Sequence, residues 1–290
     1  MGAELSRRLF GAPLPRSQAE AEKLPSFAAL PILSSDALSS VAYATEAALG
    51  VLVLAGSGAL RLSLPITAAI VVLIAIVVFS YRQTIEAYPQ GGGAYVVGRE
   101  NLGTWAALVA AASLLIDYVL TAAVSLMAGT QALTSLVPWL LPWEVVIALI
   151  LLTVVGWANL RGLRESGRLF ALPTYSFVLM VAVLAIAGAV NLLFSHGFQP
   201  DPPPAVVAAE PLGLFLILRA FSSGCSAMTG IEAIANGVQV FREPSAQRAR
   251  RTLVVMGSLL AAMFLAVSGL GFMYGIAPHP DITVLAQIGQ

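Results

Sequence analysis

The chain has 290 residues, of which 58% are hydrophobic and 10% are charged, and its 15 basic and 15 acidic residues balance to a net charge of zero. This composition excludes an ordinary soluble domain and is typical of a polytopic all-α membrane protein that sits in a lipid bilayer. The single cysteine excludes an internal disulfide, and the two histidines, His196 and His279, are too few and too far apart to hold a metal.

Residues 1–25 carry cations but no apolar core, so they are not a cleaved signal peptide and predict a cytoplasmic N-terminal segment. The remainder, residues 26–290, predicts a transmembrane domain of about seven helices. The apolar segments are 26–57, 63–87, 104–137, 142–160, 168–194, 211–240 and 252–276. The link over residues 88–95 is too rich in glycine for a regular helix.

Cationic residues predict the orientation of these helices. The outer loops of the predicted topology carry only Arg61. The inner segments carry Arg7, Arg8, Arg16, Lys23, Arg82, Arg99, Arg161, Arg164, Arg168, Arg242, Arg248, Arg250 and Arg251. An excess of Lys and Arg on one side marks the cytoplasmic side, so we expect a cytoplasmic N-terminus.

The first apolar segment contains an acid, Asp36, between small hydroxyl residues. A carboxylate at membrane depth requires partners or a wet cavity. Ser34 and Ser35 are able to satisfy an opened backbone, so we expect them to be hinges of a broken helix. Tyr43 lies two turns beyond Asp36 on the same face. An alternative is that Asp36 or a serine caps a helix that begins at Ala37.

The sixth segment is interrupted in a similar way by Ser222, Ser223 and Gly224, with Thr229 and Glu232 following on one helical face. Two interrupted helices in corresponding places indicate an inverted-repeat transporter with its site at the midplane. We therefore expect a first five-helix repeat over 26–194 and a partial second repeat over 211–290. Small residues that serve only helix packing are the alternative.

The third segment adds Asp117 and Tyr118, with Thr121 and Ser125 one and two turns after the acid. Oxygen atoms on one stripe of a buried helix suit a hard monovalent cation or a proton relay. A structural hydrogen bond between helices is the alternative reading of this stripe.

Several strings carry a resemblance to a known family. They are Leu33-Ser34-Ser35-Asp36-Ala37-Leu38-Ser39-Ser40-Val41-Ala42-Tyr43, Ser80-Tyr81-Arg82-Gln83, Tyr88-Pro89-Gln90-Gly91-Gly92-Gly93-Ala94-Tyr95, Asp117-Tyr118, Asn159-Leu160-Arg161-Gly162-Leu163 and Ala220-Phe221-Ser222-Ser223-Gly224-Cys225-Ser226. On these strings the chain resembles KimA-type potassium–proton symporters of the amino acid–polyamine–organocation superfamily, near the Kup potassium uptake proteins.

The resemblance implies a LeuT-like fold of two inverted five-helix repeats, assembled as a homodimer in a bacterial plasma membrane. The cation-site residues that it implies are Asp36, Tyr43, Asp117, Tyr118, Thr121, Thr229 and Glu232. It also implies further transmembrane helices and a cytoplasmic nucleotide-sensing domain, so we expect that this chain is a C-terminally truncated copy.

The leading hypothesis is a proton-coupled potassium importer that needs no cofactor and binds no nucleic acid. Potassium would lie at Asp36 and Asp117, and Glu232 would be the proton-coupling residue, since a buried carboxyl is able to switch between charged and neutral forms.

The alternative within the superfamily is an amino-acid permease, possibly for a cationic amino acid or a polyamine. A substrate carboxylate would bind the free N–H groups of a broken helix, and the negative charge of Asp36 at that position would repel it. An intramembrane aspartyl protease requires a Gly-x-Gly-Asp string, which does not occur. A purely structural membrane partner leaves three intramembrane acids without an explanation.

Overall fold

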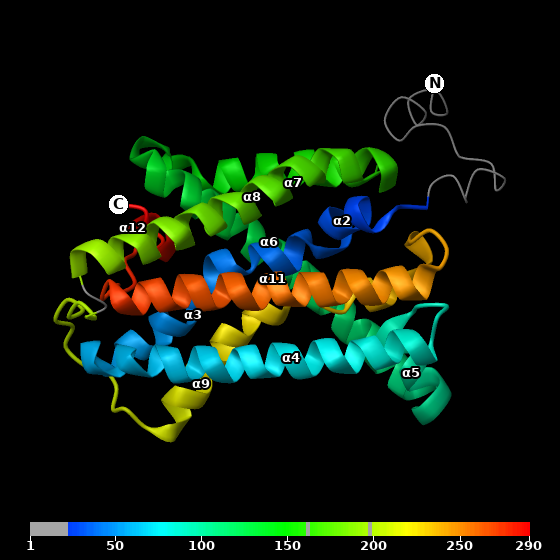
Figure 1. Ribbon diagram of the computed structural model, residues 1–290, viewed down its shortest axis with the longest axis horizontal. Coiled ribbons are helices and arrows are strands. Elements are labelled where there is room, and N and C mark those ends of the chain that lie inside the picture. Colours follow the sequence, from blue (N-terminus) through cyan, green and yellow to red (C-terminus); the bar gives the residue numbers. More distant parts are fainter. Residues whose placement is uncertain (1–22, 161–162, 197–198) are drawn as a thin grey trace.

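The computed structural model describes residues 23–160, 163–196 and 199–290, and most of them are helical (Figure 1). Within these ranges the backbone contains no β-strand and a single isolated bridge, between Leu24 and Phe241. Six helical stretches are long and apolar enough to cross a membrane: Ser26–Ala55, Ser57–Ala87, Thr104–Leu136, Pro138–Ala158, Phe170–Phe194 and Ser245–Met273. A shorter apolar stretch, Leu214–Met228, lies within the predicted sixth segment, 211–240. The all-α membrane class is confirmed.

The helices follow one another along the chain. They are α2 (Ser26–Ser39), α3 (Val41–Leu52), α4 (Ser63–Ala87), α5 (Gly93–Leu102), α6 (Thr104–Leu136), α7 (Glu144–Leu160), α8 (Leu163–Asn191), α9 (Leu214–Gly224), α10 (Ala233–Asn236), α11 (Ser245–Met273) and α12 (Val284–Ile288). Short 3₁₀ segments are η2 (Val53–Ala55), η3 (Ser57–Leu62), η4 (Pro138–Trp143), η6 (Cys225–Met228) and η7 (Val238–Val240), and η5 (Leu192–His196) is a π-helical turn.

Helix α5 was not predicted from the sequence. Residues Tyr88 to Gly92 form the expected glycine-rich turn, but a helix begins directly at Gly93. Gly91, Gly92 and Gly93 all have positive φ, of 78°, 92° and 46°. Glycine adopts this region without steric cost, so the three glycines turn the chain sharply and the following residues are free to form a helix.

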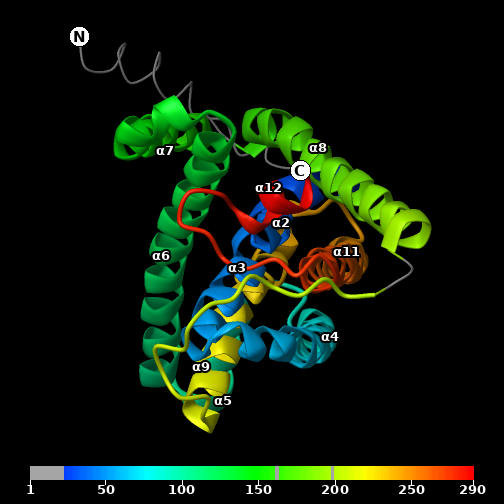
Figure 2. The same ribbon diagram turned by 90° about the vertical axis from the view of Figure 1, so that its left-hand side faces the viewer.

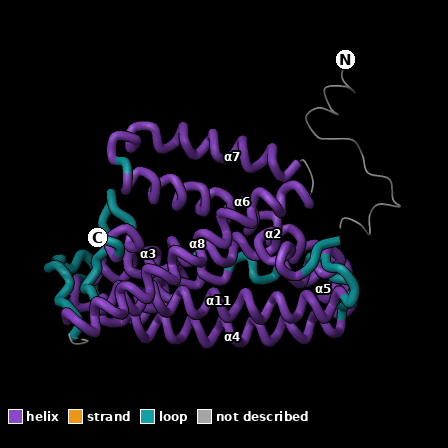
Figure 3. The backbone as a smooth tube through the Cα atoms, turned by 45° about the horizontal axis from the view of Figure 1, so that its top comes forward, coloured by secondary structure: helices purple, strands orange, loops and turns teal. Residues whose placement is uncertain are grey.

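The core lies where the first interrupted segment meets α4, α9 and α11. Helices α4 and α11 run side by side (Figures 1 and 3). A small residue permits this close approach, because a Cβ at Gly257 of α11 would lie 2.5 Å from a methyl carbon of Val78 on α4. The fully buried side chains Leu38, Leu52, Ile70, Ile74, Ile231, Leu253, Met256, Leu260 and Phe264 fill this region.

The two interrupted segments are joined by backbone at one end of the bundle. The Leu24 amide donates to the Val240 carbonyl at 2.8 Å, and the Arg242 amide donates to the Leu24 carbonyl at 3.0 Å. A side-chain ion pair between Lys23 and Glu243, at 3.6 Å, lies beside this bridge. The start of α2 is therefore tied to the chain that follows η7.

Helices α6, α7 and α8 form an outer layer (Figure 2). Their large apolar side chains point outward, including Trp105 at 84% exposure and Leu172 at 75%. In the most apolar stretch of each helix, 6% of the residues are buried in Pro138–Ala158, whereas 50% are buried in Ser245–Met273. Apolar surface of this extent suits a lipid environment, so the chain is a protein of the lipid bilayer.

Charged residues gather at the two ends of the bundle. The start of α2, α5 and the start of α11 lie together at one end (Figure 1), where Arg250 pairs with Glu86 at 3.0 Å. At the opposite end Arg219 approaches Glu210 at 4.0 Å. Arg7, Arg8, Arg16 and Arg161 lie outside the described residues, as does nearly all of the predicted segment 1–25. The cytoplasmic orientation of the N-terminus stays a prediction.

Candidate functional site

The first interrupted segment is broken later than the sequence predicts. Ser34 and Ser35, the predicted hinges, lie inside α2, which continues through Asp36 to Ser39. The junction with α3 is Ser40, whose amide still donates to the Asp36 carbonyl at 3.1 Å. The prediction of hinges at Ser34 and Ser35 is wrong because serine side chains bond to carbonyls one turn back without opening the helix.

The second segment is also broken after the predicted hinges. Ser222, Ser223 and Gly224 belong to α9, so the prediction that they unwind is wrong. The helical turn η6 continues to Met228, and the extended Thr229 (ψ 140°) and Gly230 (φ 81°) then interrupt it. A left-handed conformation favours glycine, which explains why the break falls there and not at the serine pair.

The two interruptions face one another, as we expected. The Ser40 hydroxyl lies 2.8 Å from the Ala227 carbonyl. The hydroxyls of Tyr43 and Thr229 are 3.4 Å apart. A Cβ at Gly230 would lie 2.8 Å from the Asp36 carboxylate. Asp36 therefore lies against the backbone of the second interruption.

Helix α6 supplies hydroxyl groups from a third direction. Ser125 donates to the Asp36 carboxylate at 3.4 Å, and the Tyr118 hydroxyl accepts a 2.8 Å hydrogen bond from the Asn236 amide. Thr121 is buried between these two positions. Spacings of three and four residues place the three hydroxyls on one stripe of the helix.

These groups line one side of a cavity of about 800 Å³ between α2, α6, α7 and α8. Its polar wall includes Asp36, Thr121 and Ser125. Its opposite wall is apolar and includes Leu152, Val155, Phe170 and Phe177. Asp117 is half-buried and is not among the lining residues, whereas Tyr118 and Thr121 are.

Three carboxyl groups lie within electrostatic reach of each other. Asp117 repels both Asp36 and Glu232, and Asp36 repels Glu232. None of the ion pairs found among the described residues involves these three acids. A cation between them would relieve their repulsion, and an added anion would increase it.

The second interruption holds buried oxygen atoms that lack partners. Ser226 Oγ, Glu232 Oε1 and Asn236 Oδ1 accept no hydrogen bond in the described part of the chain. Most buried polar atoms are satisfied, so three in one short segment require an explanation. A role in binding a proton or a cation would explain why these oxygen atoms have no other partner.

Among the described residues no three His, Cys, Asp or Glu side chains are arranged so that they could hold one metal ion. The oxygen atoms near Asp36 belong mostly to hydroxyl and carbonyl groups. Such neutral oxygens suit a weakly charged, easily dehydrated ion better than a divalent one.

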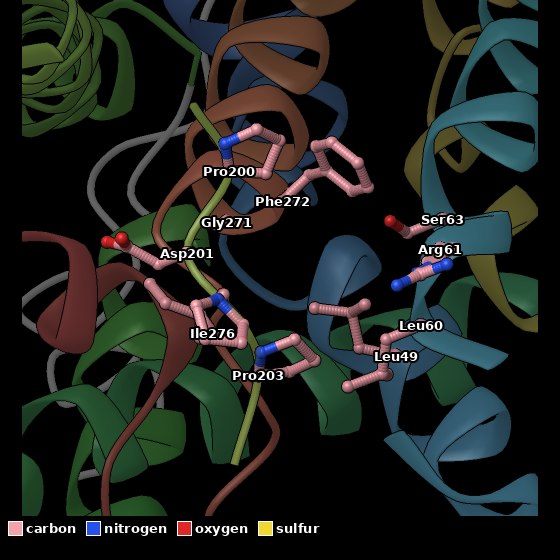
Figure 4. Close-up of a pocket in the computed structure, with 12 residues that line it drawn as sticks. Leu49, Leu60, Arg61, Ser63, Pro200, Asp201, Pro203, Gly271, Phe272 and Ile276 are labelled. Atoms are coloured by element: carbon pink, nitrogen blue, oxygen red, sulfur yellow. The ribbon is translucent and has the colours of Figure 1, made fainter. Parts of the chain in front are cut away.

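A separate cavity of about 330 Å³ lies at one end of the bundle (Figure 4). Arg61 and Ser63 lie on one wall, facing Phe272 and the prolines of the segment 200–203 across it. It contains none of the predicted site residues, so it is distinct from the place where the interruptions meet.

The sequence was compared with known proteins. The family model described as amino acid permease matches residues 27–290. The potassium transporter KimA of Bacillus subtilis (strain 168) is 47% identical over 287 residues, which cover 99% of this chain and 47% of that protein. The chain thus spans about half the length of this relative.

Proposed function

This chain belongs to the amino acid permease family, and on that premise we propose that it carries potassium into the cell together with protons. A permease moves its substrate without chemical change, so the chain is not an enzyme. We choose a cation because Asp36 lies where the two interruptions meet. Two further acids, Asp117 and Glu232, are within electrostatic reach of it. The high identity to a relative named as a potassium transporter supports potassium.

Potassium must exchange its water shell for protein oxygens. Tyr43 and Thr229 present hydroxyls that are 3.4 Å apart, and Tyr118 and Thr121 present others from α6. Asp36 would hold the ion from the first interrupted segment, while Asp117 would add negative charge from the next turn of α6. Neutral oxygens combined with one or two carboxylates offset dehydration without binding too tightly for release.

Glu232 is our proposed proton carrier. It is buried, it has one carboxyl oxygen without a partner in the described chain, and it lies beside Tyr118. A proton on this group would remove its repulsion with Asp36 and Asp117. Protonation of Glu232 and occupancy of the cation site would thereby be linked.

We also infer the setting of the transporter. Lys23 before α2, Arg82 near the end of α4, Arg99 in α5 and the arginines at the start of α11 belong to elements that meet at one end of the bundle. This excess of cations supports a cytoplasmic N-terminus in a bacterial plasma membrane. The order of the helices supports a complete first repeat and a partial second one. The first repeat would comprise α2–α3, α4, α6, α7 and α8, and the second would begin with α9–α10 and α11. Assembly as a homodimer rests on the resemblance alone.

A cationic amino acid or polyamine is a second candidate substrate. The specific observation in its favour is the cavity of about 800 Å³, which is much larger than a potassium ion and has an apolar wall opposite Asp36. An ammonium group at Asp36 with its hydrocarbon chain against Phe170 and Phe177 would use both walls.

Potassium-limited growth separates these candidates. We expect that the full-length protein restores growth of cells without other potassium uptake systems, and that lysine or spermidine in excess does not slow the uptake. Uptake of labelled lysine or spermidine without potassium uptake would favour the second candidate.

A further inference from the structure

Two small cavities lie on either side of Glu46, an acid of α3 that the proposed site does not use. Each has a volume of about 240 Å³. One lies beside Tyr43, and the other lies among residues 279–283 near the C-terminal end of the chain. Glu46, Gln131 and Thr283 line both cavities. These three polar side chains therefore form the partition between them.

The partition is held closed by hydrogen bonds from the segment 281–284, which ends at the first residue of α12. The Val284 amide donates to Glu46 Oε2 at 3.4 Å. The Thr283 amide donates to Ser135 Oγ at 3.2 Å. Segment 281–284 is thus bonded to α3 on one side and to α6 on the other.

The cavity farther from Tyr43 is rich in negative charge. Glu144 and Asp281 line it in addition to Glu46, and His279 is its single basic side chain. A concave surface lined by one sign of charge raises the local concentration of oppositely charged ions. An anion would meet three carboxylates here, whereas a monovalent cation would be attracted.

We propose that the partition formed by Glu46, Gln131 and Thr283 is the outer barrier of the cation path, and that Glu46 is the carboxylate in this barrier that receives the ion. The proposal rests on the function proposed above. Tyr43 lies three residues before Glu46, on the same side of α3, and its hydroxyl lies near Thr229. A cation that passes the partition therefore reaches the hydroxyl groups of the main site directly. Loosening of the Glu46–Val284 contact joins the two cavities.

Reagent access tests the barrier without any measurement of potassium. The background is full-length protein from which all cysteines have been removed, with Cys225→Ser among the substitutions. In this background Ala128→Cys places a single thiol in the cavity beside Tyr43, and Leu141→Cys places one in the outer cavity. A membrane-impermeant trimethylammonium thiosulfonate is added from outside. We expect slow modification of Ala128→Cys and modification about tenfold faster when Glu46→Ala removes the contact. Leu141→Cys should react quickly in both backgrounds.

Uptake kinetics test the role of the charge. Glu46→Gln should raise the KM for potassium about tenfold with little change in the maximal rate, because it removes the attracting charge. Glu46→Asp should restore most of the affinity. Glu210→Gln is the matched control, since Glu210 lies at the same end and lines neither cavity. An unchanged KM in Glu46→Gln, or equal reagent access in all variants, overturns the proposal. Normal barrier behaviour in a protein that moves no potassium would instead overturn the proposed function.

Discussion

The hydroxyl of Ser40 lies between two carbonyl oxygens, at 2.6 Å from that of Ala37 and 2.8 Å from that of Ala227. Ala37 precedes the first interruption and Ala227 precedes the second. Helix ends leave carbonyls without intrahelical donors, and the single proton of one buried hydroxyl is within hydrogen-bonding distance of a carbonyl at each end here. Ser40 therefore stabilises the junction of the two segments.

Ser40→Ala should lower the free energy of unfolding by about 1–3 kcal/mol, because it leaves a buried carbonyl without its donor. Thermal unfolding in detergent micelles measures the loss. Ser39→Ala is the control, since the Ser39 hydroxyl bonds only within its own helix, to Asp36 O at 3.0 Å. Equal losses in both variants would contradict the bridging role of Ser40.

Gly230→Ala should strongly impair both folding and uptake. The backbone φ of 81° is unfavourable for alanine, and the new methyl would lie 2.8 Å from the Asp36 carboxylate. The backbone strain alone costs about 1–3 kcal/mol. Unfolding temperature and potassium uptake measure the two effects. Gly269→Ala in α11 is the control, because nothing lies within 4 Å of its Cβ position. Similar behaviour of the two variants would show that the approach of Gly230 to Asp36 is unimportant.

Asp36→Asn should nearly abolish potassium uptake. The substitution keeps the size and hydrogen-bonding capacity of the side chain but removes the charge that offsets dehydration of the ion. Uptake into potassium-depleted cells is the measurement. Glu100→Gln, an exposed acid of α5, controls for the loss of any one negative charge. Ordinary uptake by Asp36→Asn would exclude Asp36 as a ligand.

Glu232→Gln should separate potassium flux from the proton. In the parent, uptake should rise as external pH falls, because the proton is a co-substrate. The amide imitates a permanently protonated carboxyl, so some flux should remain while its dependence on pH disappears. Uptake across a series of external pH values measures this. A pH profile like that of the parent would assign the proton to another residue.

Tyr175→Phe should destabilise the start of the first segment by about 0.5–1.5 kcal/mol. Pro31 lacks the amide that would reach the Phe27 carbonyl, and the Tyr175 hydroxyl donates to this carbonyl at 2.8 Å. Pro31→Ala supplies the missing amide, so Tyr175→Phe should cost little in that background. A double-mutant cycle on unfolding free energies measures the coupling. Equal costs in both backgrounds would show that Tyr175 does not replace the absent amide.

Much of the site was predictable from residue chemistry. An acid within an apolar helix requires polar partners, and Asp36 has one in Ser125, while Gly230 approaches its carboxylate closely. The exact breaks were not predictable from serine content, because a serine side chain fits equally well inside a helix and at its end. In the structure the second break falls at Thr229 and Gly230, where an extended residue precedes a glycine with positive φ. Gly230 was therefore the informative residue in the sequence.

Tertiary contacts account for what the sequence left open. Glycines at 91–93 indicated a turn, but the approach of Asn236 to Gly93 is visible only in three dimensions. Asp117 and Thr121 share a helix face, yet only Thr121 lines the large cavity. The positions of neighbouring helices decide which side of a stripe faces open space, and periodicity alone does not contain that information.

The bridge between Leu24 and Phe241 limits the motions open to this bundle. The first and second interrupted segments are joined there by two backbone hydrogen bonds, and they are joined again near their middle by Ser40. These two connections couple the two segments. A swing of the first segment alone would have to break both connections, whereas a joint movement of the two segments keeps both intact.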